Sequence, residues 1–371
     1  MPIQQEPINA GSFNTHLTAQ QFYQSDPWLV FVKDKLHIDN IWSTAIFFVI
    51  SILFNFSYGP FFLKDIHPTA SLRDALDLLL LSVAFTSFYL IYLLLPTFMA
   101  DMFDTLRANG VIGEYRQNSS KSISYKSFME NLLARANSRW WLAIIAMFAI
   151  LTWLQNAFIQ HPHIPLLWNV YGLLVGIIPE IYIIGFILVR VVLLLVFINR
   201  LFLLFTIHVK MLHPDGSGGL GSLEHIWWIS VGMMFAISLA ILAVTQRFVT
   251  PVGIIITTTS YIIFILALLI GWLALPHHMM IQAREELLQP IADEYERAVK
   301  ETFPSITGDT EAIVAGTERL SALQDRYKLL RDNFPVWPLE IMQMRRLGVV
   351  LIVPVLLPLL PSLLNYLFTK L

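Results

Sequence analysis

The sequence predicts an all-α fold: a polytopic transmembrane helical bundle of about seven spans. Hydrophobic residues make up 56% of the 371 residues and charged residues only 13%, whereas a soluble domain carries roughly 25% charged residues. Several apolar runs also reach about 20 residues, the length that a helix needs to cross the hydrocarbon of a bilayer. In lipid the backbone must satisfy its own hydrogen bonds, so continuous runs of this kind form helices.

Each expected span is one of these apolar runs, bounded by polar or charged residues. The spans are 41–58, 75–99, 140–159, 166–189, 227–245, 253–275 and 347–368.

The composition excludes several kinds of site. The chain has no cysteine, which excludes disulfides, thiolate metal sites and covalently attached c-type haem. The first 40 residues are polar and lack an early apolar core, so we expect no cleaved signal peptide. The formal net charge of −2 gives no indication of nucleic-acid binding.

The basic residues indicate how the spans are oriented. With the spans threaded in order, 19 of the 24 lysines and arginines fall on one side: two in 1–40, six in 100–139, two after the fourth span and nine in 277–346. Basic loops stay in the cytoplasm, so we expect the N-terminus inside and the C-terminus outside the inner (plasma) membrane. The parts are then a cytoplasmic segment 1–40, six spans in 41–276 with cytoplasmic loops at 100–139 and 190–226, a cytoplasmic segment 277–346, and the last span in 347–371.

Residues 164–212 are 49 almost uninterrupted apolar positions, which leaves two alternatives. They form either two spans with a tight turn or one long helix that bends near Pro179 and continues into the cytoplasm. Two spans would place the nine basic residues of 277–346 outside, so the charge distribution favours one helix.

Residues 277–346 predict a helical hairpin. A charged helix follows the sixth span after Pro276, and a second helix begins after Pro304 and Gly308 and runs to about residue 334. Apolar positions of the second helix are spaced alternately three and four, which gives an a/d seam. This seam packs either within the hairpin or between copies of the chain. Its positions are Ile313, Gly316, Leu320, Leu323, Tyr327, Leu330 and Phe334.

The clearest local motif is the loop HPDGSGGLG, residues 213–221. Part of it matches G-x-G-x-x-G, but a dinucleotide site needs that motif between a strand and a helix, and here a span follows. One alternative is a tight turn in which Asp215 accepts hydrogen bonds from backbone amides and glycines adopt positive φ. The other is an anion- or ligand-binding nest with His213 as a pH-sensitive partner. The candidate residues are His213, Asp215, Gly216, Gly218, Gly219 and Gly221.

This loop resembles that of a family of uncharacterised bacterial polytopic membrane proteins, which carry HPDxxGGLG after a long apolar helix with basic residues. The run Leu356-Leu-Pro-Leu-Leu-Pro-Ser362 is similar to theirs as well, and the likeness covers mainly residues 190–225 and 310–365. Fewer arginines precede the loop here than in that family. The resemblance supports the topology and implies no activity.

The expected architecture also resembles that of insect odorant and gustatory receptor channels. Those proteins have seven helices, an inside N-terminus, long fourth and sixth helices and a split seventh helix. Their cytoplasmic helix extensions build a tetramer anchor, and their last span lines the pore. The likeness is one of architecture alone, because the tyrosine-containing signature of their last helix is not recognisable here, although Tyr366 lies in that region. It implies a homo-oligomer such as a tetramer.

The last expected span has features of a pore-lining helix. Its three prolines would bend an isolated helix, and a polar stripe with three-to-four spacing occupies one face of its outer end. A polar stripe beside an apolar constriction suits a pore that gates by dewetting. The alternative is a helix end that becomes polar as it leaves the membrane. The candidate pore-lining residues are Ser362, Asn365, Tyr366 and Thr369.

Glu180 lies deep within the fourth span, and Arg190 lies at its end. Intramembrane carboxylates are costly and usually functional. A neutral Glu180 could face the bundle, pair with a tyrosine or reach water in the bend beside Pro179. We do not expect it to pair with Arg190, because ten residues span about 15 Å along a helix.

The sequence predicts neither an enzyme nor a cofactor. It has no H-E-x-x-H, no G-x-G-D and no serine in a nucleophile turn, and its histidines lack metalloenzyme spacing. The leading functional hypothesis is an oligomeric ion channel whose last helix lines the pore. The second is a non-conducting membrane sensor or scaffold that binds a cytosolic protein. The third is a secondary transporter, although no internal repeat of spans is visible. Beyond these partners we expect membrane lipids and no nucleic acid.

Overall fold

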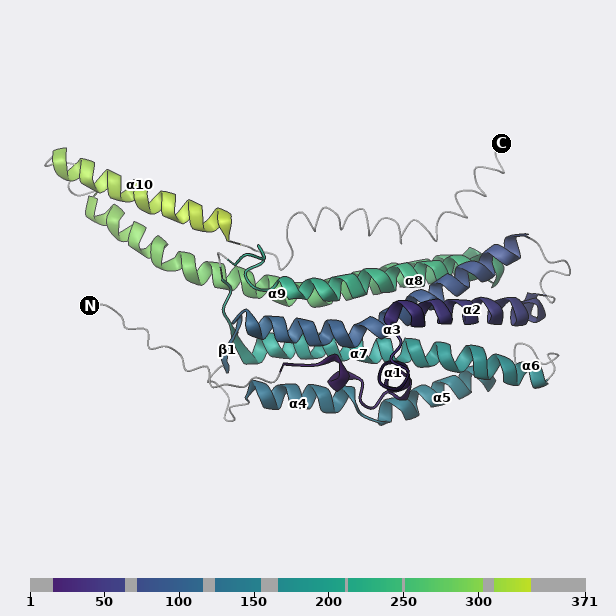
Figure 1. The fold of residues 1–371 in the computed structure, drawn as a ribbon. Coiled ribbons are helices and arrows are strands. Elements are labelled where there is room, and N and C mark those ends of the chain that lie inside the picture. The colour runs from purple at the N-terminus through teal and green to yellow at the C-terminus, as the bar shows by residue number, and fades with distance from the viewer. Residues whose placement is uncertain are drawn as a thin grey trace, which may run out of the picture.

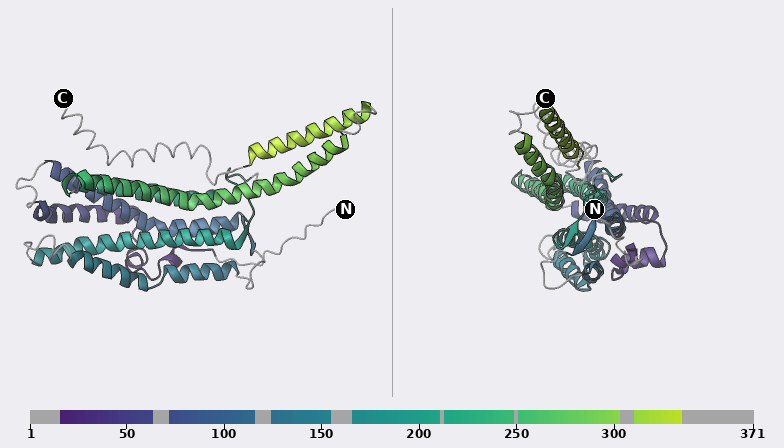
Figure 2. Two further views of the ribbon diagram at one scale, coloured as in Figure 1. Left: turned by 180° about the vertical axis from the view of Figure 1, so that it is seen from behind. Right: turned by 90° about the vertical axis from the view of Figure 1, so that its left-hand side faces the viewer.

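The structure is a computed structural model that describes residues 16–63, 72–115, 124–154, 166–210, 213–248, 251–302 and 310–334. Most of these residues form helices that lie side by side in an elongated bundle (Figures 1 and 2). This confirms the predicted helical class. The expected span 347–368 lies outside the described residues. So do the candidate pore-lining residues Ser362, Asn365, Tyr366 and Thr369.

The described residues include five helical stretches that are long and apolar enough to cross a membrane. They are 40–57, 75–108, 125–154, 172–204 and 221–243. Their length and composition are those of a membrane protein. The expected span 253–275 forms the first part of a further long helix, α9.

The elements follow one another in chain order, beginning with the short turns η1 (Ala19–Phe22), α1 (Pro27–Leu29) and η2 (Val30–Lys35). The helices are then α2 (Asn40–Leu63), α3 (Leu72–Ala108), α4 (Tyr125–Ala136), α5 (Trp140–Leu154), α6 (Leu166–Tyr171), η4 (Gly172–Ile177), α7 (Ile178–Leu204), η5 (Gly221–Leu223), α8 (Glu224–Phe248), α9 (Pro251–Thr302) and α10 (Thr310–Asn333), with strands β1 (Ile112–Tyr115) and β2 (Phe205–Ile207).

Helices α3 and α7 lie at the centre of the bundle. Helix α3 packs against α2, α7 and α8, and α7 packs against α5 on its other side (Figure 1). Helix α3 continues to Ala108, beyond the expected end at residue 99, because Met102, Phe103 and Leu106 recur at helical spacing and are buried.

Residues 166–204 form one continuous helical run, α6–η4–α7, as the charge distribution favoured. Its middle part, Gly172–Ile177, has π-helical hydrogen bonds. Pro179 follows directly, and a proline lacks the amide hydrogen and crowds the carbonyl one turn earlier. A wider π turn accommodates this defect. Gly176 allows close packing here, since an added Cβ would collide with the ring of Phe54 in α2.

A short antiparallel ribbon, which the sequence did not predict, joins the ends of α3 and α7. Ile112 pairs with Ile207, and Tyr115 pairs with Phe205. Helix α3 ends because Gly110 adopts a positive φ of 62°, the left-handed conformation that stops helices. We call this end of the bundle, with β1, β2 and the loop 213–221, the ribbon end.

Helices α9 and α10 form the predicted antiparallel hairpin, which projects beyond the bundle at the ribbon end (Figures 1 and 2). Helix α9 has 52 residues, a length of about 78 Å at 1.5 Å per residue. The seam of α10 packs within the hairpin: Leu323 is buried against Ile291 and Ala298 of α9. Leu320, Tyr327 and Leu330 flank this small core.

Candidate functional site

The most polar buried feature of the described structure is an ion pair between the N-terminal segment and α7. Arg190 Nη2 donates to Asp26 Oδ2 at 2.8 Å, and the two side chains are 1% and 0% exposed. Tyr92 of α3 and Tyr182 of α7 donate to the other carboxylate oxygen, Oδ1, at 2.6 and 2.5 Å. Asp26 therefore connects the N-terminal segment to both central helices. We call Asp26, Arg190, Tyr92 and Tyr182 the buried charge cluster.

Aromatic rings enclose the guanidinium group of the cluster. The Arg190 Cζ atom lies 5.0 Å from the ring centroid of Phe186 and 5.5 Å from that of Tyr92, within the range of cation–π attraction. Two of its nitrogens, Nε and Nη1, are buried without a hydrogen-bond partner in the described protein. Such unsatisfied donors are costly, so the positive charge depends strongly on Asp26.

Local geometry places Asp26 in the bundle. It precedes α1 as the N-cap, and its Oδ1 also accepts from the Leu29 amide at 3.2 Å. Trp28 Nε1 donates to Tyr89 of α3 at 3.1 Å, and the Tyr89 hydroxyl lies 2.7 Å from the Ser43 hydroxyl of α2. Together these contacts attach the N-terminal segment to the helices at mid-bundle.

Lys33 adds a second cation near the cluster. Its Nζ donates to the Leu93 carbonyl of α3 at 2.8 Å. Pro96 lies in the same helix, and a proline disrupts the carbonyl bonding of the preceding turn. The carbonyl that loses its amide donor to Pro96 is that of Tyr92, one residue before Leu93. Lys33 therefore donates within the turn that this proline disturbs. Burial, and then the neighbouring Arg190 charge, lower the pKa of Lys33 below its usual value, while Asp34 opposes this shift.

In the loop 213–221 the carboxylate of Asp215 gathers three backbone amides. Ser217 and Gly219 donate to Oδ1 at 3.0 Å each, and Gly221 donates to Oδ2 at 2.9 Å. The backbone amides of the loop thus surround a carboxylate of the loop itself, that of Asp215. This arrangement is the tight-turn alternative described above. Burial alone would raise the pKa of Asp215, but these amides and then His213 outweigh it and lower the pKa below its usual value.

The loop is fixed to the end of α3. Asn109 Nδ2 donates to the Gly219 carbonyl at 3.0 Å. Gly219 has a φ of 92° and lies so close to Val111 that an added Cβ would be 2.5 Å from its Cγ2. Gly216 and Gly218 also have positive φ. His213 Nδ1 is 2.8 Å from Asp215 Oδ1, so the histidine faces into the loop.

Glu180 and Arg190 do not meet, as expected from their spacing. Glu180 lines a narrow crevice between α2, α3 and α7, together with Phe47, Phe85 and Phe88 and the aliphatic Ile183 and Ile184. No hydrogen bond or ion pair joins it to another residue of the described ranges. The tyrosine beside this stretch, Tyr182, is bonded to Asp26.

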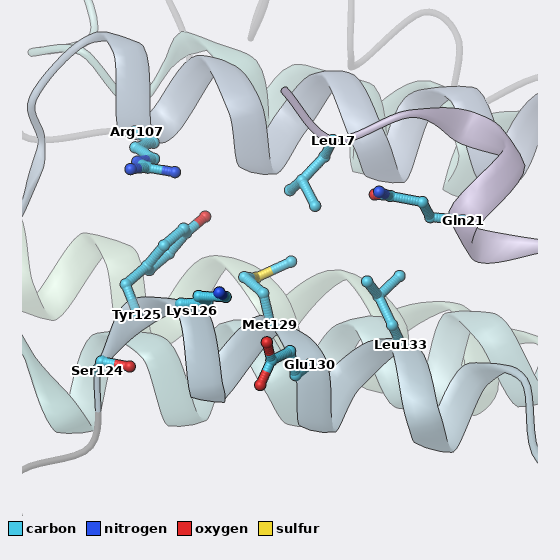
Figure 3. Close-up of a pocket in the computed structure, with 9 residues that line it drawn as sticks. All are labelled: Leu17, Gln21, Arg107, Ser124, Tyr125, Lys126, Met129, Glu130 and Leu133. Atoms are coloured by element: carbon cyan, nitrogen blue, oxygen red, sulfur yellow. The ribbon is translucent and has the colours of Figure 1, made fainter. Parts of the chain in front are cut away.

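An open pocket lies at the ribbon end, between the end of α3, helix α4 and the residues that lead into η1 (Figure 3). Arg107 enters from the α3 side, and the residues of α4 lie opposite. Among the described residues, no group of three His, Asp or Glu side chains could hold a metal ion.

Sequence reasoning identified Arg190 but missed Asp26, its partner. The only available signal was Asp26-Pro27, an N-cap residue followed by a proline at the first helical position, and that signal gives no information about a contact with α7. The sequence shows the pocket residues Arg107 and Lys126 only as two of the six basic residues in 100–139.

The chain matches no protein-family model, no curated protein and no solved structure.

Proposed function

We propose that this protein is a multi-pass protein of the inner (plasma) membrane that assembles into an oligomeric ion channel. The observation that carries the proposal is the α9–α10 hairpin: a single helix runs from the bundle into a projecting helical pair (Figure 1). A continuous helix of this length can couple an assembly element outside the membrane to segments within it.

The hairpin has exposed residues at which self-association can be tested. Its internal seam is satisfied by the Ile291, Ala298 and Leu323 core. Apolar side chains nevertheless remain on the outside: Leu287 is 45% exposed and Val314 is 53% exposed. Single exposed apolar side chains are common on protein surfaces, so Leu287 and Val314 serve here as positions at which the proposed contact between copies can be tested.

The pore is assigned to the last segment, where Asn365 and its polar neighbours form the predicted stripe. In this proposal the N-terminus, the ribbon end and the hairpin face the cytoplasm, in accordance with the distribution of basic residues. The buried charge cluster then holds the cytoplasmic N-terminal segment on the two central helices.

Recording from the purified full-length protein in planar bilayers, combined with its mass in detergent, tests this proposal. We expect an oligomer and a conductance whose ion selectivity shifts toward cations in Asn365→Asp, because a carboxylate in a pore attracts them. Asn131→Asp, the same change on the exposed side of α4, is the matched control and should leave selectivity unchanged. A monomer without conductance across voltages would contradict the proposal.

The second candidate is a non-conducting sensor or scaffold, which the same exposed hairpin residues favour. In that case the full-length protein stays monomeric, and Val314→Glu abolishes cross-linking to one specific cytosolic protein. In the channel proposal Val314→Glu instead reduces the oligomer mass, so the two outcomes are distinguishable.

A further inference from the structure

The pocket in Figure 3 has a charged end and a largely aliphatic end. Arg107, Ser124 and Lys126 lie at one end, whereas Leu17 and Leu133 lie at the other beside the amide of Gln21, with Met129 between the two ends. The pocket encloses roughly 1000 Å³ that protein atoms do not fill, including its open mouth. Neither the buried charge cluster nor the loop 213–221 contributes to it.

Arg107 provides an available positive charge. Its Cζ lies 5.4 Å from the ring centroid of Tyr125, and it has no hydrogen bond or ion pair with another residue in the described ranges. The nearby acid Asp104 is 2.9 Å from His16. Glu130 lies across the pocket from Arg107, on α4, with its carboxylate on the side of Lys126 (Figure 3). A guanidinium that forms no ion pair with a carboxylate of the described residues can bind the carboxylate or phosphate of a ligand with two parallel hydrogen bonds.

Two further features make the same end favourable for an anion. Lys126 brings a second cation to the pocket wall. Helix α4 also begins here, with Ser124 as its N-cap accepting from the Ser127 amide at 3.1 Å. The N-terminal end of a twelve-residue helix adds positive potential to that of the two side chains. The Tyr125 hydroxyl donates to the Phe103 carbonyl at 3.3 Å, which fixes the ring under Arg107.

The other end suits an apolar chain. Leu17 and Leu133 offer aliphatic walls, and a methionine such as Met129 adapts its shape to a flexible ligand. Lys126 and Leu133 are seven residues apart on α4, about 10 Å along its axis, which matches an alkyl chain of about eight carbons. The carboxylate of Glu130, on the α4 wall, would repel a ligand that carries more than one negative charge.

We propose that this pocket binds a small amphipathic monoanion: a free carboxylic acid with a medium-length apolar chain, its carboxylate on Arg107 and its chain toward Leu17 and Leu133. This proposal does not rest on the channel proposal. A phospholipid shares the chemistry of an anionic head and an apolar tail, so the experiment must distinguish the two sources.

Calorimetric titration of octanoate into the full-length protein in phosphatidylcholine nanodiscs tests the pocket. We expect one site per chain, and Arg107→Gln should weaken binding about tenfold or more, because a charged hydrogen-bond donor is lost. Arg107→Lys should retain part of the affinity. Arg139→Gln removes the same charge from an exposed position outside the pocket and should bind as the wild type does. Acetate and octanol, which each lack one half of the ligand, should both bind more weakly than octanoate.

Several outcomes would overturn the assignment. Equal octanoate binding by wild type and Arg107→Gln would mean that the ligand partitions elsewhere, and no saturable binding would mean that the pocket is only a surface crevice. Acetate binding as strong as octanoate binding would remove the role of the apolar end. Mass spectrometry of co-purified molecules separates the sources: loss of free fatty acid in Arg107→Gln supports the proposal, whereas loss of phospholipid instead contradicts it.

Discussion

Arg190 Nη2 donates to Asp26 Oδ2 at 2.8 Å although 164 residues separate the two in the chain. Both side chains are almost completely buried, and no other carboxylate of the described structure forms an ion pair with Arg190. This contact fixes the N-terminal segment on α3 and α7. Breaking this contact should therefore destabilise the protein.

Asp26→Ala should destabilise the protein by about 3 to 5 kcal/mol, because it leaves a buried guanidinium without its counter-charge. Asp26→Ala combined with Arg190→Met should recover a large part of this loss, since the unpaired charge is then absent. Thermal unfolding in detergent, followed by tryptophan fluorescence, measures both. The exposed pair of Arg319 and Glu301 is the control, and Arg319→Ala should change stability by less than about 1 kcal/mol. Equal losses in Asp26→Ala and Arg319→Ala would contradict the prediction.

Asp215→Asn should loosen the loop 213–221, because an amide offers one acceptor oxygen where the carboxylate serves three backbone donors. We expect a loss of about 1 to 3 kcal/mol at pH 7. Hydrogen exchange at the amides of Ser217, Gly219 and Gly221 should accelerate.

The effect of Asp215 also has a defined pH dependence. The folded protein lowers the pKa of this carboxyl below its usual value of 3.8, so its contribution is complete above that value. The contribution decreases as the pH falls through the lowered pKa. The part of the stability difference between wild type and Asp215→Asn that comes from ionisation of this carboxyl should therefore be lost only below about pH 4. A difference that already shrinks near neutral pH would rule out this carboxylate as the cause.

Gly219→Ala should destabilise the protein by roughly 1 to 3 kcal/mol, because φ is 92° and the new Cβ would meet Val111 at 2.5 Å. Gly271 of α9 is the matched control, since an added Cβ there has no atom within 4 Å. Gly271→Ala should raise stability by about 0.5 to 1 kcal/mol, as expected for a helix interior. Thermal unfolding of both variants measures the sign of the change in stability. A loss of similar size in both would contradict the explanation that an added Cβ at position 219 collides with Val111.

The charged form of Lys33 should lower the free energy of unfolding at neutral pH, because burial disfavours this form in the folded state and so lowers the pKa of Lys33. This cost disappears as the pH rises to the usual lysine value of 10.5. The stability of wild type relative to Lys33→Met should therefore increase between pH 7.5 and 10.5. Leu36→Met, on the same segment, changes no charge, so its difference from wild type should not vary with pH. A flat profile for Lys33→Met would count against the assigned shift.

The helical class and most helix positions could be predicted because hydropathy and membrane thickness constrain them directly. The single helix through 166–204 followed from the charge distribution, and the hairpin followed from the seam around Leu323. These features depend on local periodicity, which the sequence displays. Orientation, oligomeric state and the role of Asn365 remain predictions.

The contacts that define the candidate site depend on distant parts of the chain. Nothing near Asp26 in the sequence indicates Arg190, and the ribbon between Ile112 and Ile207 is too short to show strand alternation. The extension of α3 to Ala108 was missed because its last turns mix charged and apolar residues. In each case tertiary packing supplies the determining interaction.

The order of synthesis gives the Asp26–Arg190 contact a further consequence. Asp26 leaves the ribosome 164 residues before Arg190 does, an interval of about 10 to 30 s at typical translation rates. During that time Asp26 lacks the guanidinium that it binds in the folded protein, so the centre of the bundle can close only after α7 has been made. Asp26 and the turns around it, η1 to η2, are thus made early in synthesis but reach their final positions only after α7 has been made.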